Sequence, residues 1–318
     1  MKYDVIALGE LLMDFTNSGV SEQGNIVFEA NPGGAPCNVL AMLSQYGHLT
    51  AFIGKVGVDL FGSRLKETLN ELNIDASNLI ADESVRTTLA FVHNYPDGER
   101  EFSFFRNPGA DMMLTWQEIS EQLLTDGRIF HFGTLSMTNE PVRSATRWAV
   151  KTAKEKGAFI SFDPNLRENL WSSKEEAKEQ VVFGLEHCDI LKISDEELLW
   201  LTDITDSAEA VKFLQNQYRI PLILLSLGRQ GSRAYYQDIM AEAGAFIQPQ
   251  TVDTTGAGDT FLGSCLHFVL QSGMEHLNKE RLTEMLVHAN AAAALITTRK
   301  GALRSMPQIS EVERMVKQ

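Results

Sequence analysis

Residues 253–261 read Asp253-Thr254-Thr255-Gly256-Ala257-Gly258-Asp259-Thr260-Phe261. The composition of 245–252 predicts a strand before them, and apolar residues at helical spacing over 262–269 predict a helix after them, which Gly273 would end. Two glycines at a helix start let the backbone approach a ligand closely, and the free amides there favour an anion. Asp259 would fall in the first helical turn, where a carboxylate can accept a proton from an attacking hydroxyl. The alternative is an ordinary helix start with an acidic residue.

Short apolar runs alternate with longer amphipathic segments along the rest of the chain. Strands that alternate with helices favour parallel pairing through crossovers, and therefore an α/β sheet covered on both faces. Ligands of such sheets bind at the carboxyl ends of the strands. The predicted strands are 5–8, 50–53, 129–132, 159–162, 190–193 and 222–225, and the predicted helices include 38–46, 60–72 and 141–156.

A second kind of pattern interrupts this alternation. Residues 87–94 and 100–106 alternate polar and apolar side chains around the turn sequence Pro96-Asp97-Gly98, which predicts a β-hairpin. Together with an earlier strand-like segment, it predicts a small antiparallel sheet made of about 12–32 and 86–108. This sheet is either a decorative edge or a lid that excludes water from a site.

The composition limits the classes of function. Lys and Arg number 28 and Asp and Glu 42, so the net charge is −14, and sequence-independent binding of nucleic acid is disfavoured. Hydrophobic residues make up 44% and charged residues 22%, which is typical of a globular protein. No run of eighteen apolar residues predicts a membrane span. The three cysteines are scattered and show no zinc or disulfide spacing, which favours a cytoplasmic location.

A glycine-rich loop precedes the first long helix. It reads Asn31-Pro32-Gly33-Gly34-Ala35-Pro36-Cys37-Asn38, and the chain has neither a P-loop nor a dinucleotide-binding glycine motif. Gly33 and Gly34 would permit close approach of a small polar molecule, and Asn38 could pair with hydroxyl groups. On the residues alone, a simple loop is an equally good interpretation.

Taken together, these motifs resemble the ribokinase-like carbohydrate kinases of the phosphofructokinase-B type. The resemblance covers the whole chain in order, and it implies one kinase domain over 1–318 with a three-layer αβα fold, a mainly parallel central sheet and a small antiparallel β lid. Within the family, the chain is most similar to the fructokinases, although Cys37 replaces their usual alanine. The stretches that carry this similarity are 33–39, 105–111, 162–167, 170–171 and 191–197.

The resemblance implies a catalytic role for Asp259 as general base. Gly256, Ala257 and Gly258 would bind the transferring phosphoryl group through their amides, with help from Arg167, which on its own could be a surface residue. Sugar hydroxyls would bind at the end of the first strand and at the glycine-rich loop, and the lid would cover the sugar. The residues implied for these two tasks are Asp14, Gly33, Gly34 and Asn38, followed by Phe91, Phe104 and Arg106.

The resemblance also implies ATP and metal ions as cofactors. Lys192 would lie near the phosphates and Glu197 would organise Mg²⁺ through water, although 195–197 could equally be an acidic helix start. Further residues would border the nucleotide, or supply mostly main-chain oxygens to K⁺. They are Ser226, Gly228, Gly231, Gly256, Gly258 and Asn290 for the nucleotide, and Asp253, Thr255, Ile296, Arg299, Gly301 and Ser305 for the ion.

The expected activity is therefore that of an ATP-dependent sugar kinase that converts D-fructose to D-fructose 6-phosphate. Alternatives within the family are a 2-keto-3-deoxygluconate kinase, a ribokinase and a riboside kinase. A non-catalytic sugar or nucleotide sensor on the same fold is an alternative of another class.

The aromatic residues of the predicted hairpin are too many for a free surface, so we also expect a homodimer in which the lids pack together. They are Phe91, Phe102, Phe104 and Phe105.

Overall fold

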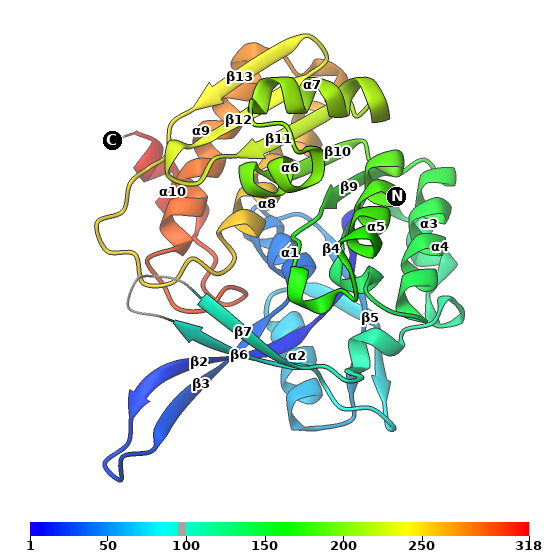
Figure 1. Cartoon of the computed structure of the whole chain (residues 1–318), viewed down its shortest axis with the longest axis vertical. Helices are drawn as coiled ribbons and strands as arrows, with labels where there is room; N and C mark the ends of the chain where they lie inside the picture. The colour runs from blue at the N-terminus through cyan, green and yellow to red at the C-terminus, as the bar shows by residue number, and fades with distance from the viewer. Residues whose placement is uncertain (95–99, 318) are drawn as a thin grey trace.

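A large, mostly parallel sheet forms the centre of the molecule (Figure 1). The computed structural model describes residues 1–94 and 100–317, so the predicted turn at 95–99 lies outside the described residues. Within the described part, nine strands follow the order β13-β12-β11-β10-β9-β8-β1-β4-β5, and every neighbouring pair from β11 to β5 is parallel. The strands are β1 (Tyr3–Leu8), β4 (Thr50–Gly57), β5 (Ile74–Asp82), β8 (Gly127–Gly133), β9 (Phe159–Asp163), β10 (Ile190–Ser194), β11 (Leu222–Ser226), β12 (Ser232–Tyr236) and β13 (Ile239–Ala243).

Helices cover both faces of this sheet and complete a three-layer α/β fold. Two apolar cores result, one on each face, because each helix buries one stripe of side chains against the strands. The first layer contains α1 (Ala35–Gln45), α2 (Leu60–Glu71), α8 (Ala257–Ser272), α9 (Lys279–Ile296) and α10 (Ile309–Val316). The second contains α3 (Glu121–Thr125), α4 (Val142–Glu155), α5 (Lys174–His187), α6 (Asp195–Thr202) and α7 (Ser207–Tyr218).

The predicted strand over 245–252 is wrong. β13 ends at Ala243, and the chain from 244 to 254 is irregular. The physical cause lies on α9, where the Asn290 side-chain amide donates to the carbonyls of Ala243 and Gly244, each at 3.1 Å. These bonds hold the chain at the point where it leaves the sheet, and the segment after them pairs with no strand. The helix predicted after it is confirmed as α8, which Gly273 ends.

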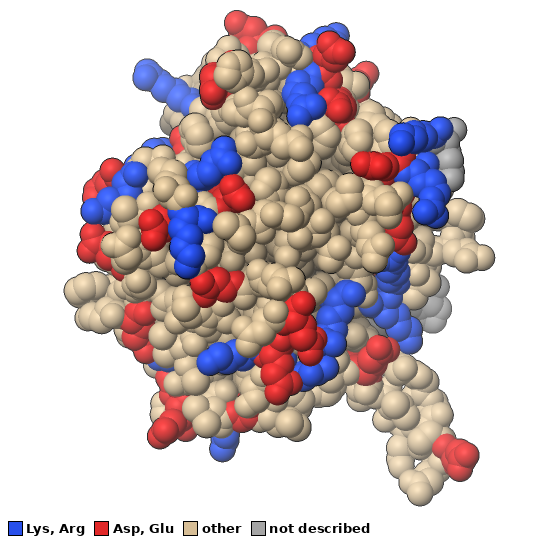
Figure 2. All heavy atoms as spheres, turned by 180° about the vertical axis from the view of Figure 1, so that it is seen from behind, with Lys and Arg blue, Asp and Glu red and all other residues tan. Residues whose placement is uncertain are grey.

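The second, smaller sheet projects from the body of the molecule (Figure 1). Its order is β3-β2-β6-β7, with two antiparallel hairpins joined by a parallel pairing of β2 with β6. The hairpin β2–β3 extends away from the domain, and from behind most of its surface carries no charged side chain (Figure 2). The strands are β2 (Leu12–Val20), β3 (Ile26–Gly33), β6 (Leu89–Asn94) and β7 (Arg100–Phe105).

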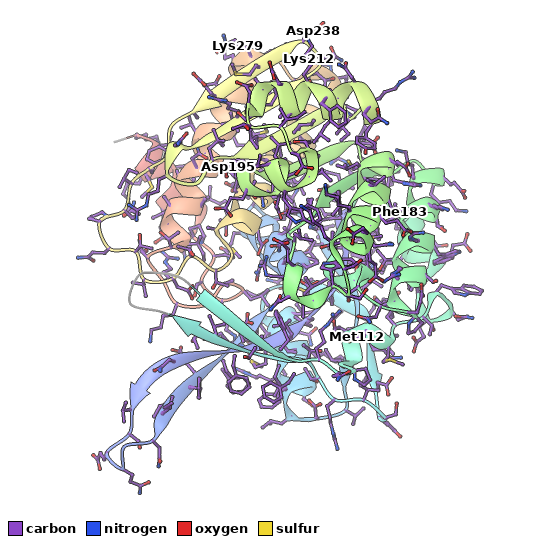
Figure 3. All side chains as sticks on the ribbon, viewed as in Figure 1. Met112, Phe183, Asp195, Lys212, Asp238 and Lys279 are labelled. Atoms are coloured by element: carbon purple, nitrogen blue, oxygen red, sulfur yellow. The ribbon has the colours of Figure 1, made fainter. Side chains whose placement is uncertain are left out.

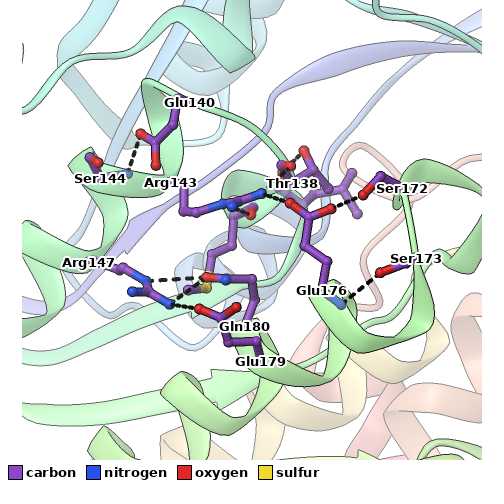
Figure 4. Close-up of polar contacts among 12 residues, drawn as sticks. Thr138, Glu140, Arg143, Ser144, Arg147, Ser172, Ser173, Glu176, Glu179 and Gln180 are labelled. Atoms are coloured by element: carbon purple, nitrogen blue, oxygen red, sulfur yellow. Dashed lines mark hydrogen bonds and ion pairs between the residues drawn. The ribbon is translucent and has the colours of Figure 1, made fainter.

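A polar network connects α4 and α5 and supports the turn that follows β8 (Figure 4). Arg143 of α4 donates to the carbonyls of Met137 and Thr138 at 2.8 and 2.6 Å, and it pairs with Glu176 of α5. One turn later, Arg147 donates to Gln180 Oε1 at 2.9 Å. The carboxyl end of β8 is thereby fixed where the sheet edge faces the small sheet.

No described helix combines the length and the apolar character that a membrane crossing needs.

A pair of histidines joins the loop after α1 to α8 at the opposite end of the sheet. His48 Nε2 lies 2.9 Å from His267 Nδ1, so one ring nitrogen donates a hydrogen bond and the other accepts it. The His267 ring also stacks on Tyr46, with 3.9 Å between ring centroids. Burial, together with His48, Arg281 and His288, lowers the pKa of His267 to about 4. The packing therefore requires a neutral imidazole.

We predict that this site loses stability in acid. The unfolded chain protonates His267 near its ordinary pKa of about 6.5, whereas the folded chain does so near 4, so stability is lost as the pH falls through this window. His267→Gln removes the proton uptake. The measurement is the free energy of unfolding of the variant minus that of wild type, obtained by denaturant titration at pH 7.5 and at pH 5. This difference should be about 1–2 kcal/mol more positive at pH 5. His276→Gln, whose side chain is 71% exposed, is the control and should show no such change with pH. A pH-independent difference for His267→Gln would contradict the prediction.

Candidate active site

Two adjoining cavities open at the carboxyl ends of the parallel strands. The first, of about 390 Å³, lies between the strand ends and the small sheet, and the second, of about 410 Å³, extends over α6 and α9. They share Thr254, Ala257 and Gly258 at the N-terminus of α8, and Ser194 and Glu196 at the start of α6, so these two helix starts form the boundary between them. This is the edge of the sheet at which the sequence predicts that ligands bind.

The start of α8 brings its first acidic residue to the floor of the first cavity. Gly256 caps the helix with a φ of 78°, a left-handed conformation that favours glycine, and Asp259 lies buried in the first turn. The Nδ2 of Asn38, on α1, donates to Asp259 Oδ2 at 2.7 Å. Burial raises the pKa of the Asp259 carboxyl, and the bond from Asn38 opposes this rise. Asp259 thus combines access to the cavity with an environment that favours taking up a proton.

The glycine-rich loop packs against the segment that follows β1. A side chain at Gly33 would collide with the Asp14 carboxylate, and one at Gly34 would collide with the Glu10 carbonyl. Glu10 itself is buried, and its Oε1 accepts a hydrogen bond from the Ala35 amide at 2.9 Å. Glu10 lines the first cavity and was not singled out from the sequence, because an acidic residue after a strand carries no distinctive pattern.

Asp14 does line the first cavity, but its predicted place at the end of the first strand is wrong. It is the third residue of β2, and it belongs to the small sheet. Burial raises the pKa of Asp14 to about 7, and Arg167 acts in the opposite direction. The sequence misled here because β1 ends at Leu8 and the chain re-enters a different sheet at Leu12.

The two faces of the small sheet separate the residues that were predicted to cover a sugar. Asp14, Ala90 and Phe104 are in register across β2, β6 and β7, and Phe104 lines the first cavity. Since side chains alternate along a strand, Phe91 points to the other face, where its ring stacks on Phe15 at 4.8 Å. The structure therefore corrects the expectation that Phe91 reaches the sugar.

Arg106 also lies outside the lining of the first cavity. Its guanidinium donates to Asp111 Oδ2 at 2.7 Å, to Thr138 Oγ1 at 2.9 Å and to the Leu135 carbonyl at 2.9 Å. These bonds hold the end of β7 to the turn after β8, so Arg106 braces the small sheet against the body. The expectation that Arg106 contacts the sugar directly is therefore corrected: its guanidinium supports the position of the small sheet.

Cationic and acidic groups meet between the two cavities. Arg167 lines the first cavity, and its Nη1 donates to Asn165 Oδ1 at 2.8 Å. Lys192 lines it as well and pairs with Asp163. Glu197 turns inward, where Oε1 accepts from the Leu166 amide and Oε2 from the Ser194 amide, both at 2.9 Å. Glu197 thereby braces the loop that carries Arg167.

The second cavity has the loop after β11 on one side and α9 on the other. Asn290 borders it, but its side chain is engaged internally: Oδ1 accepts from Ser232 Oγ at 2.8 Å, and the amide donates to the 243–244 carbonyls. Asp195, at the start of α6, faces this region (Figure 3). Apolar residues of the segment predicted as a strand, Phe246 and Ile247, form part of the wall. The predicted residues on the lining are Ser226, Gly228, Gly231, Gly258 and Asn290.

The residues expected around a monovalent ion come from two loops that do meet. Asp253 accepts hydrogen bonds from the Thr255 amide at 2.9 Å and from the Gly301 amide at 3.1 Å. Arg299 donates from its backbone amide to the Ile296 carbonyl at 3.1 Å and from Nη1 to the Ser305 carbonyl at 3.2 Å. The loops therefore lie together beside the start of α8. Among the described residues, no group of three His, Cys, Asp or Glu side chains is arranged to hold a metal ion.

Comparison with known proteins agrees with this geometry. The family model described as pfkB family carbohydrate kinase matches residues 2–309. The chain belongs to the pfkB family of carbohydrate kinases. It is 41% identical over 314 residues to "Fructokinase-1" of Zea mays, which covers 98% of this chain and 97% of that protein. It is 42% identical over 305 residues to "Probable fructokinase-2" of Arabidopsis thaliana, and the match covers 95% of this chain and 92% of that protein.

Solved structures of pfkB-type kinases match the fold over its whole length. A fructokinase with bound ATP from Xylella fastidiosa superposes with a TM-score of 0.90 at 30% identity, covering 100% of this chain and 99% of the other. A double mutant of the Vibrio cholerae fructokinase, in a form that binds fructose, ADP and a potassium ion, gives 0.89 at 30% identity and covers 99% of each chain. As a member of this family, the protein is a phosphotransferase that acts on an alcohol group.

Proposed function

We propose that the protein is an ATP:D-fructose 6-phosphotransferase. The observation that carries this proposal is the position of Asp259, which is buried in the first turn of α8, lines the first cavity next to its boundary with the second, and is bonded to Asn38. A sugar in the first cavity and a nucleotide in the second would meet at this residue. The fructokinases at about 40% identity over nearly the full chain support fructose as the acceptor.

The mechanism follows from what these residues can do. Fructose lies between Asp14, Gly34 and Asn38, with its 6-hydroxyl toward Asp259. Asp259 accepts the hydroxyl proton as the oxygen attacks the γ-phosphorus of ATP in line and ADP leaves. The amides at the start of α8, over 256–258, stabilise the charge that collects on the transferring phosphoryl group. Arg167 and Lys192, which line the same cavity, add positive charge there.

A chain of net charge −14 needs cations to bind a polyphosphate. When bound, Mg²⁺ would neutralise phosphate charge, and Glu197 would organise it through water. For K⁺, the candidate ligands are the loops around Asp253 and Gly301, whose main-chain oxygens are the chemistry that this ion prefers. The K⁺-bound fructokinase of similar fold supports this assignment.

The small sheet would act as a lid on one kinase domain. Phe104 and Asp14 present the face that closes over the sugar, while Arg106 anchors β7 through its bonds to Asp111, Thr138 and the Leu135 carbonyl. A closed lid excludes water, which would otherwise accept the phosphoryl group. The competing substrates are 2-keto-3-deoxygluconate, ribose and ribosides, and a sensor without catalysis would not need a buried base at Asp259.

The first prediction tests the base. Asp259→Asn keeps the size of the side chain and removes its capacity to accept a proton, so turnover should fall by roughly 10²–10⁴-fold while ATP binding is largely retained. Steady-state kinetics and calorimetric titration with ATP measure the two effects. Asp189→Asn is the control, because Asp189 precedes β10 at the opposite edge of the sheet, and it should leave turnover near wild type. Near-normal turnover of Asp259→Asn would remove this residue from the mechanism.

A second prediction concerns the acceptor. A site that pairs with particular hydroxyls rejects a sugar that leaves its buried polar groups unpaired. Fructose should therefore be phosphorylated with a kcat/KM at least roughly tenfold above ribose, glucose or 2-keto-3-deoxygluconate, which corresponds to about 1.4 kcal/mol. Competition assays with product identification by NMR should find fructose 6-phosphate. A preference for an acidic sugar, or a 1-phosphate product, would refute the choice of fructose and leave the kinase activity standing.

We also propose that two copies of the chain associate through their lids. The outer part of the small sheet exposes apolar side chains, including Ile26 at 61% and Phe105 at 65% exposure. Their neighbours Val20, Val27 and Phe28 are exposed as well. An apolar surface of this kind favours burial against a partner, and a second lid offers the same surface in return.

The third prediction follows from this surface. Wild-type protein should sediment as a dimer at micromolar concentration, and Ile26→Asp should shift it toward monomer because a carboxylate would be buried in the contact. Phe213→Asp is the matched control, since Phe213 on α7 is 45% exposed and far along the chain from the lid, and it should remain dimeric. A wild-type monomer, or dissociation by both variants alike, would argue against a lid interface.

A further inference from the structure

Asp163 is a buried carboxylate to which the proposed mechanism gives no task. It is the last residue of β9, and 3% of its surface is exposed. Phe162 pairs with Leu191 in the neighbouring strand β10, so the next residues along, Asp163 and Lys192, are neighbours on one face of the sheet. The Lys192 Nζ lies 3.0 Å from Asp163 Oδ2 and 3.2 Å from Oδ1. This is a close ion pair at the carboxyl edge of the sheet.

The cationic end of this pair faces the start of α8. A Cβ atom added at Gly258 would lie 3.1 Å from Lys192 Nζ, so the ammonium group is packed directly beside the backbone at the boundary of the two cavities. Lys192 lines the first cavity, whereas Asp163 lies behind it and outside the lining. Any effect of Asp163 on a ligand must therefore pass through Lys192.

The rest of the Asp163 side chain is fixed by the loop that follows β9. Its Oδ1 also accepts a hydrogen bond from the Asn165 amide at 3.1 Å. This bond orients the carboxylate and, at the same time, begins the loop that carries Arg167 to the cavity. A carboxylate held in this way presents its second oxygen to Lys192 in one direction only.

Electrostatics give the pair a consequence for the charge of Lys192. Burial lowers the pKa of this lysine, but the carboxylates of Asp163, Glu197 and Asp259 outweigh burial, so its pKa is raised. Among these carboxylates, Asp163 makes the largest contribution and is the direct partner. A lysine side chain is also long and flexible, so without a fixed partner it would lose both its position and part of its charge.

We infer that Asp163 is a positioning residue for phosphoryl transfer, which holds the Lys192 ammonium at the amide end of α8 where the nucleotide phosphates bind. The inference rests on the proposed kinase function and adds to it a residue that touches neither substrate. Asp163 lies in a fructokinase-like stretch of the sequence, but no role for it can be predicted there, since its partner lies on another strand.

The test is the affinity for ATP in the presence of Mg²⁺, measured by calorimetry between pH 6.5 and 9.5 for wild type and Asp163→Asn. The variant removes the charge and keeps the shape. Its affinity should be lower by roughly 10- to 100-fold, the usual effect of losing a charged hydrogen bond. The loss should grow as the pH rises, because burial then dominates and Lys192 releases its proton at lower pH than in wild type. A merely structural role would give a loss that does not depend on pH.

Four further variants complete the test. Asp189→Asn, at the amino-terminal edge of the same strands, should keep wild-type affinity at every pH. Lys192→Gln should weaken binding by itself, and adding Asp163→Asn to it should change little, because both act through one ammonium group. Asp163→Glu keeps the charge and should cause a smaller loss without a trend in pH. A loss that grows with pH in this variant would count against the inference, which keeps the inference falsifiable if Asp163→Asn does not fold.

The outcomes separate this inference from the proposed function. An Asp163→Asn loss that is constant with pH and equally large in the Lys192→Gln background would overturn the inference, as would a pH-dependent loss in Asp163→Glu. Binding of ATP needs no sugar, so the expected pattern without phosphorylation of any sugar would support the positioning role and overturn the proposed acceptor. Phosphorylation of fructose together with a pH-independent loss of ATP affinity, equally large in the Lys192→Gln background, would support the proposed acceptor and overturn the positioning role of Asp163.

Discussion

The hydrogen bond from Asn38 Nδ2 to Asp259 Oδ2, at 2.7 Å, is the contact on which the site depends. It joins the first turns of two helices, α1 and α8, which pack side by side on one face of the sheet although their sequences are far apart. Both ends of the bond are buried, so either group without the other would be left unpaired at considerable cost. The bond therefore fixes the glycine-rich loop and the amide end of α8 in one arrangement, and the boundary between the two cavities follows from it.

Electrostatics impose the next constraint, because the first cavity contains more acids than bases. Its acidic lining residues are Glu10, Asp14, Glu196, Glu197 and Asp259, while Arg167 and Lys192 are the basic side chains among the lining residues that the structure describes. Burial raises the pKa values of Glu10 and Asp14 to about 7, which shows how costly further negative charge would be there. A phosphate group could enter only where amides and cations face it, at the start of α8. The same acids suit a neutral sugar, since carboxylates accept hydrogen bonds from hydroxyl groups.

The sequence predicts the layered fold well because the strands of a covered parallel sheet form continuous apolar runs. It also predicts the start of α8, because two glycines before an apolar helical pattern indicate a helix start that can bind an anion. Prediction from the sequence fails where contacts between distant parts of the chain determine the local structure or the place of a side chain. The 245–252 segment has the composition of a strand but is irregular, and Asn290 binds the carbonyls of the two residues that precede it. Arg106 has the sequence context of a ligand-binding residue, but its guanidinium makes hydrogen bonds to Asp111 and to the turn after β8. Glu10 and Asp163 act through partners that no local pattern identifies.

Alternation along β2, β6 and β7 gives the small sheet two separate tasks. Asp14 and Phe104 face the cavity, and the residues next to them, Phe15 and Phe105, face away from it. A shift of one residue in any of these strands would exchange its two sets of side chains; in β2 it would place Phe15 against the sugar cavity and the Asp14 carboxylate on the apolar outer face. The bonds of Arg106 to the body oppose such a shift in β7, and the packing of Gly33 against Asp14 opposes it between β2 and β3. The register of the lid is thus fixed from the main domain, so that closing over a ligand and presenting an apolar outer surface are properties of the same few strands.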